Sequence, residues 1–115
     1  MKSLEASRVN IMVNDMDHSV KFYTETLGLE LLNRWGNHYA EIQAADLTLA
    51  LHEKNKGHQV GTTCSIGFGV RSFDDEVAVL QSKGIAVSVE QDAYVRLAHF
   101  QDPDGHPLFL AERNK

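Results

Sequence analysis

The chain has a single cysteine, few positive charges and no long apolar run, and each absence narrows what the protein can be. Cys64 has no second cysteine to pair with, so a disulfide within the chain is excluded and a reduced, cytoplasmic location is expected. The 11 Lys and Arg residues are outnumbered by 16 Asp and Glu residues and form no basic cluster, so we expect no nucleic-acid partner. No stretch approaches the roughly 20 apolar residues that cross a bilayer, so we expect no membrane partner.

Short catalytic motifs are absent as well. The sequence contains no glycine-rich phosphate loop, no nucleophile elbow and no CxxC pair. It does contain 115 residues, of which 43% are hydrophobic and 23% are charged. This composition is ordinary for a soluble globular protein, and the length fits one domain, which we assign to residues 1–115.

The most informative feature is an internal repeat. Residues 13–28 read VNDMDHSVKFYTETLG, and residues 70–84 read VRSFDDEVAVLQSKG. Each copy has an apolar strand end, a short polar turn, an amphipathic helix and a terminal glycine, and strand-like sequence follows it. A repeat of this kind indicates two copies of one supersecondary unit. We assign module one to about residues 6–53, a linker to about residues 54–62 and module two to about residues 63–112.

Module one is predicted to begin with a strand at residues 8–13 (RVNIMV), in which alternate residues are apolar. Residues 14–17 supply oxygens that can cap a helix, and Gly28 fits the left-handed position that ends it. Three further strands are predicted: one that starts at residues 29–32, and two at residues 39–43 and 47–52. The order is therefore one strand, one helix and three strands, βαβββ.

Module two is predicted to repeat this order. Its first strand is expected at residues 64–70, and Ser72 and Asp75 are spaced for a capping box at the start of its helix. Val77 and Leu80 are expected to form the buried stripe of that helix. The remaining strands are predicted at residues 85–89, 94–100 and 108–111, with a tight turn at residues 102–106 (DPDGH) before the last.

Two segments resemble signatures of a known superfamily, the vicinal oxygen chelate proteins. VNDMDHSVKFYTETLGLEL resembles the opening helix of these proteins, and FQDPDGHPLFL resembles their closing turn and last strand. The superfamily includes glyoxalase I, extradiol dioxygenases, fosfomycin-resistance thiol transferases and bleomycin-resistance proteins, and the resemblance covers about residues 7–112. It implies an α+β fold in which two paired βαβββ modules form a curved mixed sheet around a cavity. It does not imply one reaction, because this fold hosts many.

The resemblance also implies where the enzymes of the superfamily hold their metal. Matched motif by motif, the three ligand positions fall on Arg8, Ser65 and Phe109 in this chain. A guanidinium has no lone pair to donate, a phenyl ring has no donor atom, and a serine hydroxyl is a weak neutral ligand. We therefore expect no metal and no other cofactor.

Other polar residues offer alternatives. Glu41, His52 and His99 stand on predicted strands whose faces, by the resemblance, point into the cavity, so they could form a displaced metal site or act as catalytic acid and base. They could equally be polar wall residues, because no spacing motif links them. Trp35 could stack on a planar ligand, anchor an interface or fill space in part. Gly67 could open space on the cavity face or mark a close approach of the backbone.

We expect a small-molecule-binding protein that sequesters its ligand without metal, as the bleomycin-resistance branch does. Arg8 is the main anchor candidate for a carboxylate or phosphate of the ligand, unless Glu41 neutralises it internally. The alternatives are a glyoxalase-like lyase or isomerase, a dioxygenase-like enzyme, and a structural dimer with a vestigial cavity. The resemblance implies a homodimer. The cavity residues that it implies are Arg8, Asn10, Tyr39, Glu41, Thr48, His52, Ser65, His99 and Phe109.

Overall fold

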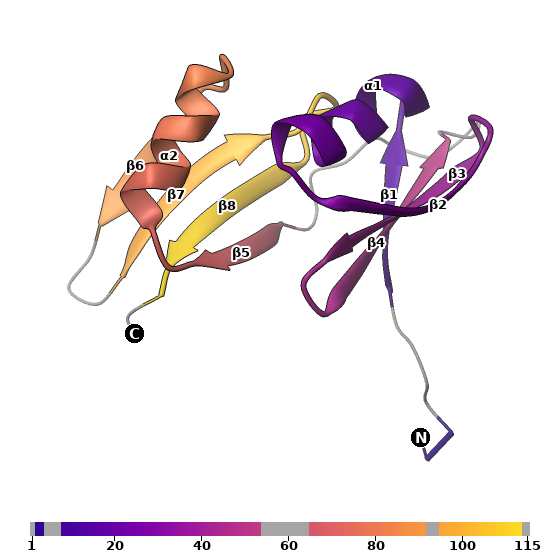
Figure 1. Ribbon diagram of the computed structural model, residues 1–115, viewed down its shortest axis with the longest axis horizontal. Coiled ribbons are helices and arrows are strands. Elements are labelled where there is room, and N and C mark those ends of the chain that lie inside the picture. The colour runs from indigo at the N-terminus through magenta and orange to yellow at the C-terminus, as the bar shows by residue number, and fades with distance from the viewer. Residues whose placement is uncertain (1, 4–7, 54–64, 92–94, 114–115) are drawn as a thin grey trace. The chain divides into compact units, whose positions relative to one another are not determined.

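The computed structural model describes residues 2–3, 8–53, 65–91 and 95–113. The chain divides into two compact units, Met1–Gly61 and Thr62–Lys115. Each unit is a βαβββ module (Figure 1), so the predicted α+β class and the predicted order of elements are confirmed. The predicted linker and Cys64 lie outside the described residues.

The first unit contains a four-stranded mixed sheet in the order β1-β4-β3-β2. Strand β1 pairs with β4 in parallel, and the other neighbours are antiparallel. Helix α1 packs against β3 and β4. The bounds are β1 Arg8–Val13, α1 Met16–Lys21, β2 Glu30–Trp35, β3 Tyr39–Ala44 and β4 Leu47–Glu53.

The core of the first unit lies between this helix and one face of the sheet. Ile42, Leu49 and Leu51 from the two central strands are fully buried, and Tyr23 joins them from the helical segment. Along β1 the burial alternates, with Ile11 buried and its neighbours more exposed. This period of two assigns alternate residues of each strand to opposite faces of the sheet, so the remaining side chains line the other face.

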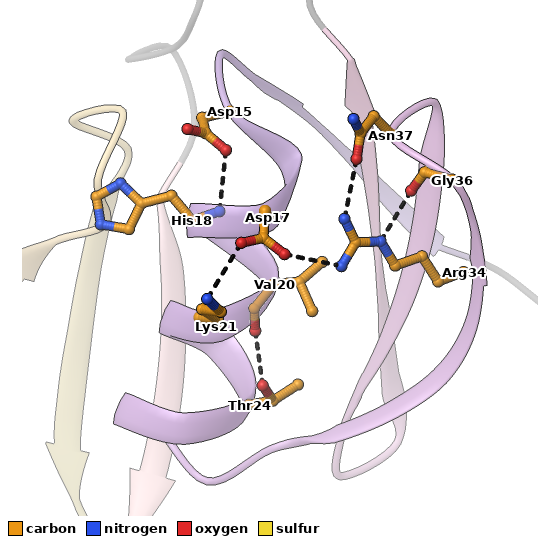
Figure 2. Close-up of polar contacts among 9 residues, drawn as sticks. All are labelled: Asp15, Asp17, His18, Val20, Lys21, Thr24, Arg34, Gly36 and Asn37. Carbon is orange, nitrogen blue, oxygen red and sulfur yellow. Dashed lines mark hydrogen bonds and ion pairs between the residues drawn. The ribbon is translucent and has the colours of Figure 1, made fainter.

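The start of helix α1 carries the predicted cap (Figure 2). The Asp15 carboxylate accepts a hydrogen bond from the backbone N–H of His18 over 3.1 Å. Asp17 in the first turn contacts Lys21 one turn later, with 3.2 Å between Nζ and Oδ2, and Arg34 of β2, with 3.5 Å between Nη1 and Oδ1. These two contacts, that with Lys21 first, hold the pKa of Asp17 below its ordinary value. Arg34 therefore connects the β2–β3 hairpin to the helix.

The helix does not continue as an α-helix to Gly28, as its apolar spacing predicts. It ends at Lys21, and Phe22–Thr26 form a π-helical turn in which the Leu27 N–H donates to the carbonyl of Phe22, five residues back, over 3.0 Å. The Thr24 hydroxyl donates to the Val20 carbonyl over 2.7 Å (Figure 2), and this side-chain bond competes for the acceptor of the regular helix. Gly28 then adopts the predicted left-handed conformation, with φ +74°.

The second unit has the same topology, in the strand order β5-β8-β7-β6. Strands β5 and β8 are parallel and the other pairs are antiparallel. Phe73, Val77 and Leu80 form the buried stripe of its helix, as predicted for the last two. The bounds are β5 Ile66–Val70, α2 Phe73–Ser82, β6 Ser88–Gln91, β7 Arg96–Gln101 and β8 Pro107–Glu112.

Two predictions for the second unit are wrong in detail. The Ser72 side chain makes no capping hydrogen bond, and its backbone, with φ -106° and ψ 68°, is not in the extended conformation of a usual N-cap. The Ser72 carbonyl accepts the first helical hydrogen bond, from Glu76 N–H, over 3.0 Å. Strand β6 begins at Ser88 rather than at residue 85. The reason is that the Ile85 N–H still donates to the Leu80 carbonyl, so the chain leaves the helical turn only after this residue.

Arg96 connects the helix and the sheet of the second unit. Its guanidinium lies 2.9 Å from Asp74 on α2 and 2.8 Å from Glu112 on β8, and its Cζ lies 4.5 Å from the centre of the Phe73 ring. These hydrogen bonds, that with Glu112 first, raise the pKa of Arg96, and Arg96 lowers the pKa of Glu112. Neither described helix is long and apolar enough to cross a membrane.

Candidate functional site

The face of the first sheet that points away from helix α1 carries a continuous set of polar and aromatic side chains. We call it the polar face. Strand register sets its members side by side, because Trp35 pairs with Tyr39 and Tyr39 pairs with His52, while Asn33 pairs with Glu41. The polar face consists of Arg8, Asn10, Asn33, Trp35, Tyr39, Glu41, Thr48, Ala50 and His52.

Asn10 is the hub of one half of the polar face. Its Oδ1 accepts a hydrogen bond from Arg8 Nε over 3.3 Å and lies 3.0 Å from His52 Nε2. An amide oxygen only accepts, so the Nε2 of His52 carries the proton in this contact. Asn10 therefore orients both the guanidinium and the imidazole, and the two terminal nitrogens of Arg8 have no protein partner among the described residues.

Glu41 is the hub of the other half. Its Oε2 accepts from the Tyr39 hydroxyl over 2.7 Å, and its Oε1 accepts from the Asn33 amide over 3.0 Å. These hydrogen bonds, with the more distant charge of Arg8, hold the pKa of Glu41 below its ordinary value. Desolvation, together with the contact to Glu41, raises the pKa of Tyr39. Two neutral donors thus hold this carboxylate, and Arg8 acts on it through its charge and not through a hydrogen bond among the described residues.

Three rings lie in a row across the polar face. The centres of the Trp35 and Tyr39 rings are 5.3 Å apart, and those of Tyr39 and His52 are 4.9 Å apart. The Cζ of Arg8 lies 5.9 Å from the centre of the Tyr39 ring. Trp35 is 54% exposed, so it is not the partly buried filler that the sequence left open.

The matching face of the second unit is built around Phe109. Its ring lies over Gly67 of β5, and its centre is 6.1 Å from the ring centre of His99 on β7. His99 Nε2 lies 2.8 Å from Glu90 Oε1 on β6. Ser65 is exposed and directly precedes β5. Gly67 thus permits a close approach, and the aromatic ring occupies the space that a side chain at this position would need.

A groove of about 590 Å³ also lies within the second unit. It runs between residues 84–88, which precede and begin β6, and the adjoining ends of β7 and β8. The residues that line it are both polar, such as Ser88, His99 and Gln101, and apolar, such as Phe100 and Leu108. His99 is therefore the one sequence-predicted site residue that lines this groove.

The donor chemistry of the mapped metal positions does not fit a divalent cation. Arg8 presents a guanidinium, Phe109 presents a ring, and only the hydroxyl of Ser65 carries lone pairs. Glu41 and His52, expected as alternatives, already contact Tyr39, Asn33 and Asn10.

Among the described residues, three side chains that could ligate a metal come together in the turn before β8. Single ligand atoms of Asp102, Asp104 and His106 lie within 4.8 Å of one another. However, Oδ1 of Asp102 accepts the backbone N–H groups of Asp104 and His106, each over 2.9 Å, so this carboxylate stabilises the turn itself.

The structure brings together five of the predicted residues, namely Arg8, Asn10, Tyr39, Glu41 and His52. Thr48 lies on the same face, with its hydroxyl 3.5 Å from the Gln43 amide oxygen. Sequence reasoning missed Asn33, because it located only the start of the second strand, at residues 29–32. The alternation of Asn33 and Trp35 beyond this point was the available signal.

The chain matches one family model and is similar to a known protein over most of its length. The model of the Glyoxalase/Bleomycin resistance protein/Dioxygenase superfamily matches residues 6–109. An uncharacterized protein of Mycolicibacterium smegmatis is 30% identical over 110 residues, which are 94% of this chain and 93% of that protein.

Solved structures of similar fold include proteins of different function. The antibiotic binding protein TnmS3 from a Streptomyces species is 26% identical, covers 99% of both chains and superposes with a TM-score of 0.83. A lactoylglutathione lyase from Agrobacterium tumefaciens is 16% identical, covers 96% of this chain and 93% of its own, and has a TM-score of 0.78. The second likeness concerns the fold alone.

Proposed function

Because this chain belongs to the glyoxalase/bleomycin resistance protein/dioxygenase superfamily, we propose that it is a small-molecule-binding protein that sequesters its ligand without a metal. The observation that carries the proposal is the polar face, where an oriented guanidinium is exposed beside a hydrogen-bonded carboxylate. The likeness to an antibiotic binding protein over nearly the whole chain supports a ligand of that general kind.

Arg8 is the proposed anchor of the ligand. Its Nε is held by Asn10, while both terminal nitrogens can meet a carboxylate or phosphate as a fork. Within the second unit, His99, Phe109 and Ser65 are proposed as residues that can contact a ligand. Glu41 accepts hydrogen bonds from Tyr39 and Asn33 and forms no direct ion pair with Arg8.

The alternative is an enzyme of the lyase, isomerase or dioxygenase type with Glu41, His52 or His99 as acid and base. Two hydrogen bonds hold the pKa of Glu41 below its ordinary value, which makes its carboxylate a weaker proton acceptor. The mapped metal positions also carry the wrong donor atoms. Both observations support binding over catalysis.

A thermal-shift screen of small molecules, antibiotics included, tests the proposal. A ligand at 100 times its Kd stabilises the folded protein by roughly 2.7 kcal/mol. Arg8→Met should weaken the binding of an anionic ligand by about 1.5–3 kcal/mol. It should leave the melting temperature of the unliganded protein unchanged. Arg71→Met, which removes an exposed arginine just after β5, is the matched control and should bind as wild type does.

A double variant tests whether Glu41 neutralises the charge of Arg8. Arg8→Met/Glu41→Gln should melt no higher than Arg8→Met does, because Arg8 is not the direct partner of that carboxylate and a glutamine oxygen can accept only one of its two hydrogen bonds. A loss of stability in Arg8→Met that Glu41→Gln reverses would show that the two residues neutralise each other. A panel in which no compound stabilises the wild-type protein would contradict the proposed function.

A further inference from the structure

We infer that the polar face of the first unit takes a flat aromatic ligand that carries a negative charge. This inference rests on the proposed function and names the chemical class of the ligand. It draws on the ring row, on the position of the Arg8 guanidinium beside that row, and on the hydrogen bonds that hold the carboxylate of Glu41 to Tyr39 and Asn33 and not to Arg8.

The ring row is the first step. Trp35, Tyr39 and His52 occupy register-paired positions on three adjacent strands, so their spacing is set by the sheet and not by flexible loops. The Trp35 and Tyr39 planes are inclined by 38° at 5.3 Å, so the two rings are not parallel, and 54% of Trp35 is exposed. The exposed indole therefore keeps a π surface that a planar ligand can cover.

The guanidinium is the second step. Arg8 Cζ and the Trp35 ring both lie close to the same tyrosine ring, at 5.9 Å and 5.3 Å from its centre. A ligand that lies over Trp35 and Tyr39 can thus reach the terminal nitrogens of Arg8 with a substituent on its edge. Those nitrogens offer N–H donors in a fork that matches a carboxylate.

The groups around Arg8 favour a negative charge on the ligand. Asn33 and Tyr39 donate hydrogen bonds to the two carboxylate oxygens of Glu41, so neither oxygen is hydrogen-bonded to Arg8. Asn10 fixes the inner nitrogen of the guanidinium through a neutral oxygen. Asn10 therefore orients the cation without a charge of its own, and Glu41 acts on Arg8 only through its charge at longer range. A direct ion pair with Arg8 is left for an anionic substituent of the ligand.

Three small probes test the inference. Naphthoate is flat, aromatic and anionic; decalin carboxylate has the same charge and a similar size without a π system; and naphthamide is flat but neutral. Trp35 is the single tryptophan of the chain, so quenching of its fluorescence reports directly on a ring that covers it. Calorimetry supplies affinities for variants that lack the indole.

We expect naphthoate to bind and to quench Trp35, and decalin carboxylate and naphthamide to bind about tenfold more weakly or worse. Trp35→Leu should weaken naphthoate by about tenfold, Trp35→Phe should retain most of the affinity, and Arg8→Met should abolish the preference for naphthoate over naphthamide. Val89→Ser, which alters an exposed apolar residue of edge strand β6, is the control and should bind as wild type does. Circular dichroism verifies that each variant is folded.

Two results would overturn the inference. Equal binding of decalin carboxylate and naphthoate, unaffected by Trp35→Leu, would mean that the polar face binds anions without regard to aromaticity; the proposed function would then stand. Absence of naphthoate binding at millimolar concentration would also overturn it. In that case the outcome of the thermal-shift screen decides separately whether the protein binds another class of small molecule.

Discussion

The ring of Phe109 lies directly over the α-carbon of Gly67 on the neighbouring parallel strand. A Cβ placed on Gly67 would come within 2.5 Å of Phe109 Cε2 and would overlap with Cζ as well. The two residues are register partners between β5 and β8, although 42 positions separate them in the sequence. A single glycine thus permits the largest side chain on this face of the second unit.

Gly67→Ala should therefore destabilise the protein by about 1–3 kcal/mol, because the new methyl group forces the ring of Phe109 out of place. Gly67→Ala/Phe109→Leu should recover part of this loss, since the shorter side chain vacates the space. Urea unfolding of the two single variants and the double variant forms a mutant cycle. Strictly additive effects would show that the ring moves aside without cost.

Asp102→Ala should destabilise the turn before β8. The buried Asp102 carboxylate accepts two backbone N–H groups, from Asp104 and His106, and its removal leaves both donors without this acceptor. We expect a loss of about 1–3 kcal/mol, and a smaller loss for Asp102→Asn, which keeps an acceptor oxygen. Chemical denaturation checks both values. An equal loss in the two variants would indicate that the charge, and not the acceptor, stabilises the turn.

Acid should weaken the connection between Arg96 and Glu112. The pKa of Glu112 is lowered in the folded protein, chiefly by its hydrogen bonds with Arg96. The ion pair therefore contributes fully above the ordinary glutamate pKa, near 4.5, and its contribution is lost as the pH falls through the lower folded value. Unfolding free energies measured from pH 7 downward should fall less steeply in Glu112→Gln than in wild type. Glu76→Gln, which removes an exposed carboxylate that has no contact with Arg96, is the control and should follow the wild-type curve.

Purified protein should contain no stoichiometric nickel, zinc, iron or manganese. Two of the three positions that match metal ligands in the superfamily's enzymes, Arg8 and Phe109, have no lone pair to offer. Elemental analysis after purification without chelator measures the metal content. About one metal per chain, removable with loss of an activity, would contradict metal-free sequestration.

The protein should be a homodimer with twofold symmetry. Strands β2 and β6 are outer strands of their described sheets, and the exposed apolar residues Leu31 and Leu32 lie on β2. Unpaired strand edges with apolar side chains favour association, and a closed twofold dimer is its commonest form. Sedimentation at micromolar concentration measures the mass. A species of 12.9 kDa would contradict this prediction.

The sequence alone was sufficient for the βαβββ order of both modules and for the superfamily. Strand alternation, helical spacing and the capping residue Asp15 all depend on neighbours within a few positions, and such local preferences can be read directly from a sequence. Two local details were nevertheless not predicted correctly from the sequence. The π-helical turn follows from a side-chain bond of Thr24, and Ser72 makes no capping bond although its spacing suggests one.

Only the tertiary structure decided which polar groups meet. Asn33 reaches Glu41 across a register shift in β2, His52 reaches Asn10 across 42 positions, and Arg8 lies beside Tyr39 from an edge strand. Alternation tells which face a residue occupies, but the register between strands sets its neighbours, and a single bulge changes that register. The sequence could therefore suggest Arg8 and Glu41 as partners, whereas strand pairing places Tyr39 and Asn33 against Glu41, and the terminal nitrogens of Arg8 have no hydrogen-bond partner within the described ranges.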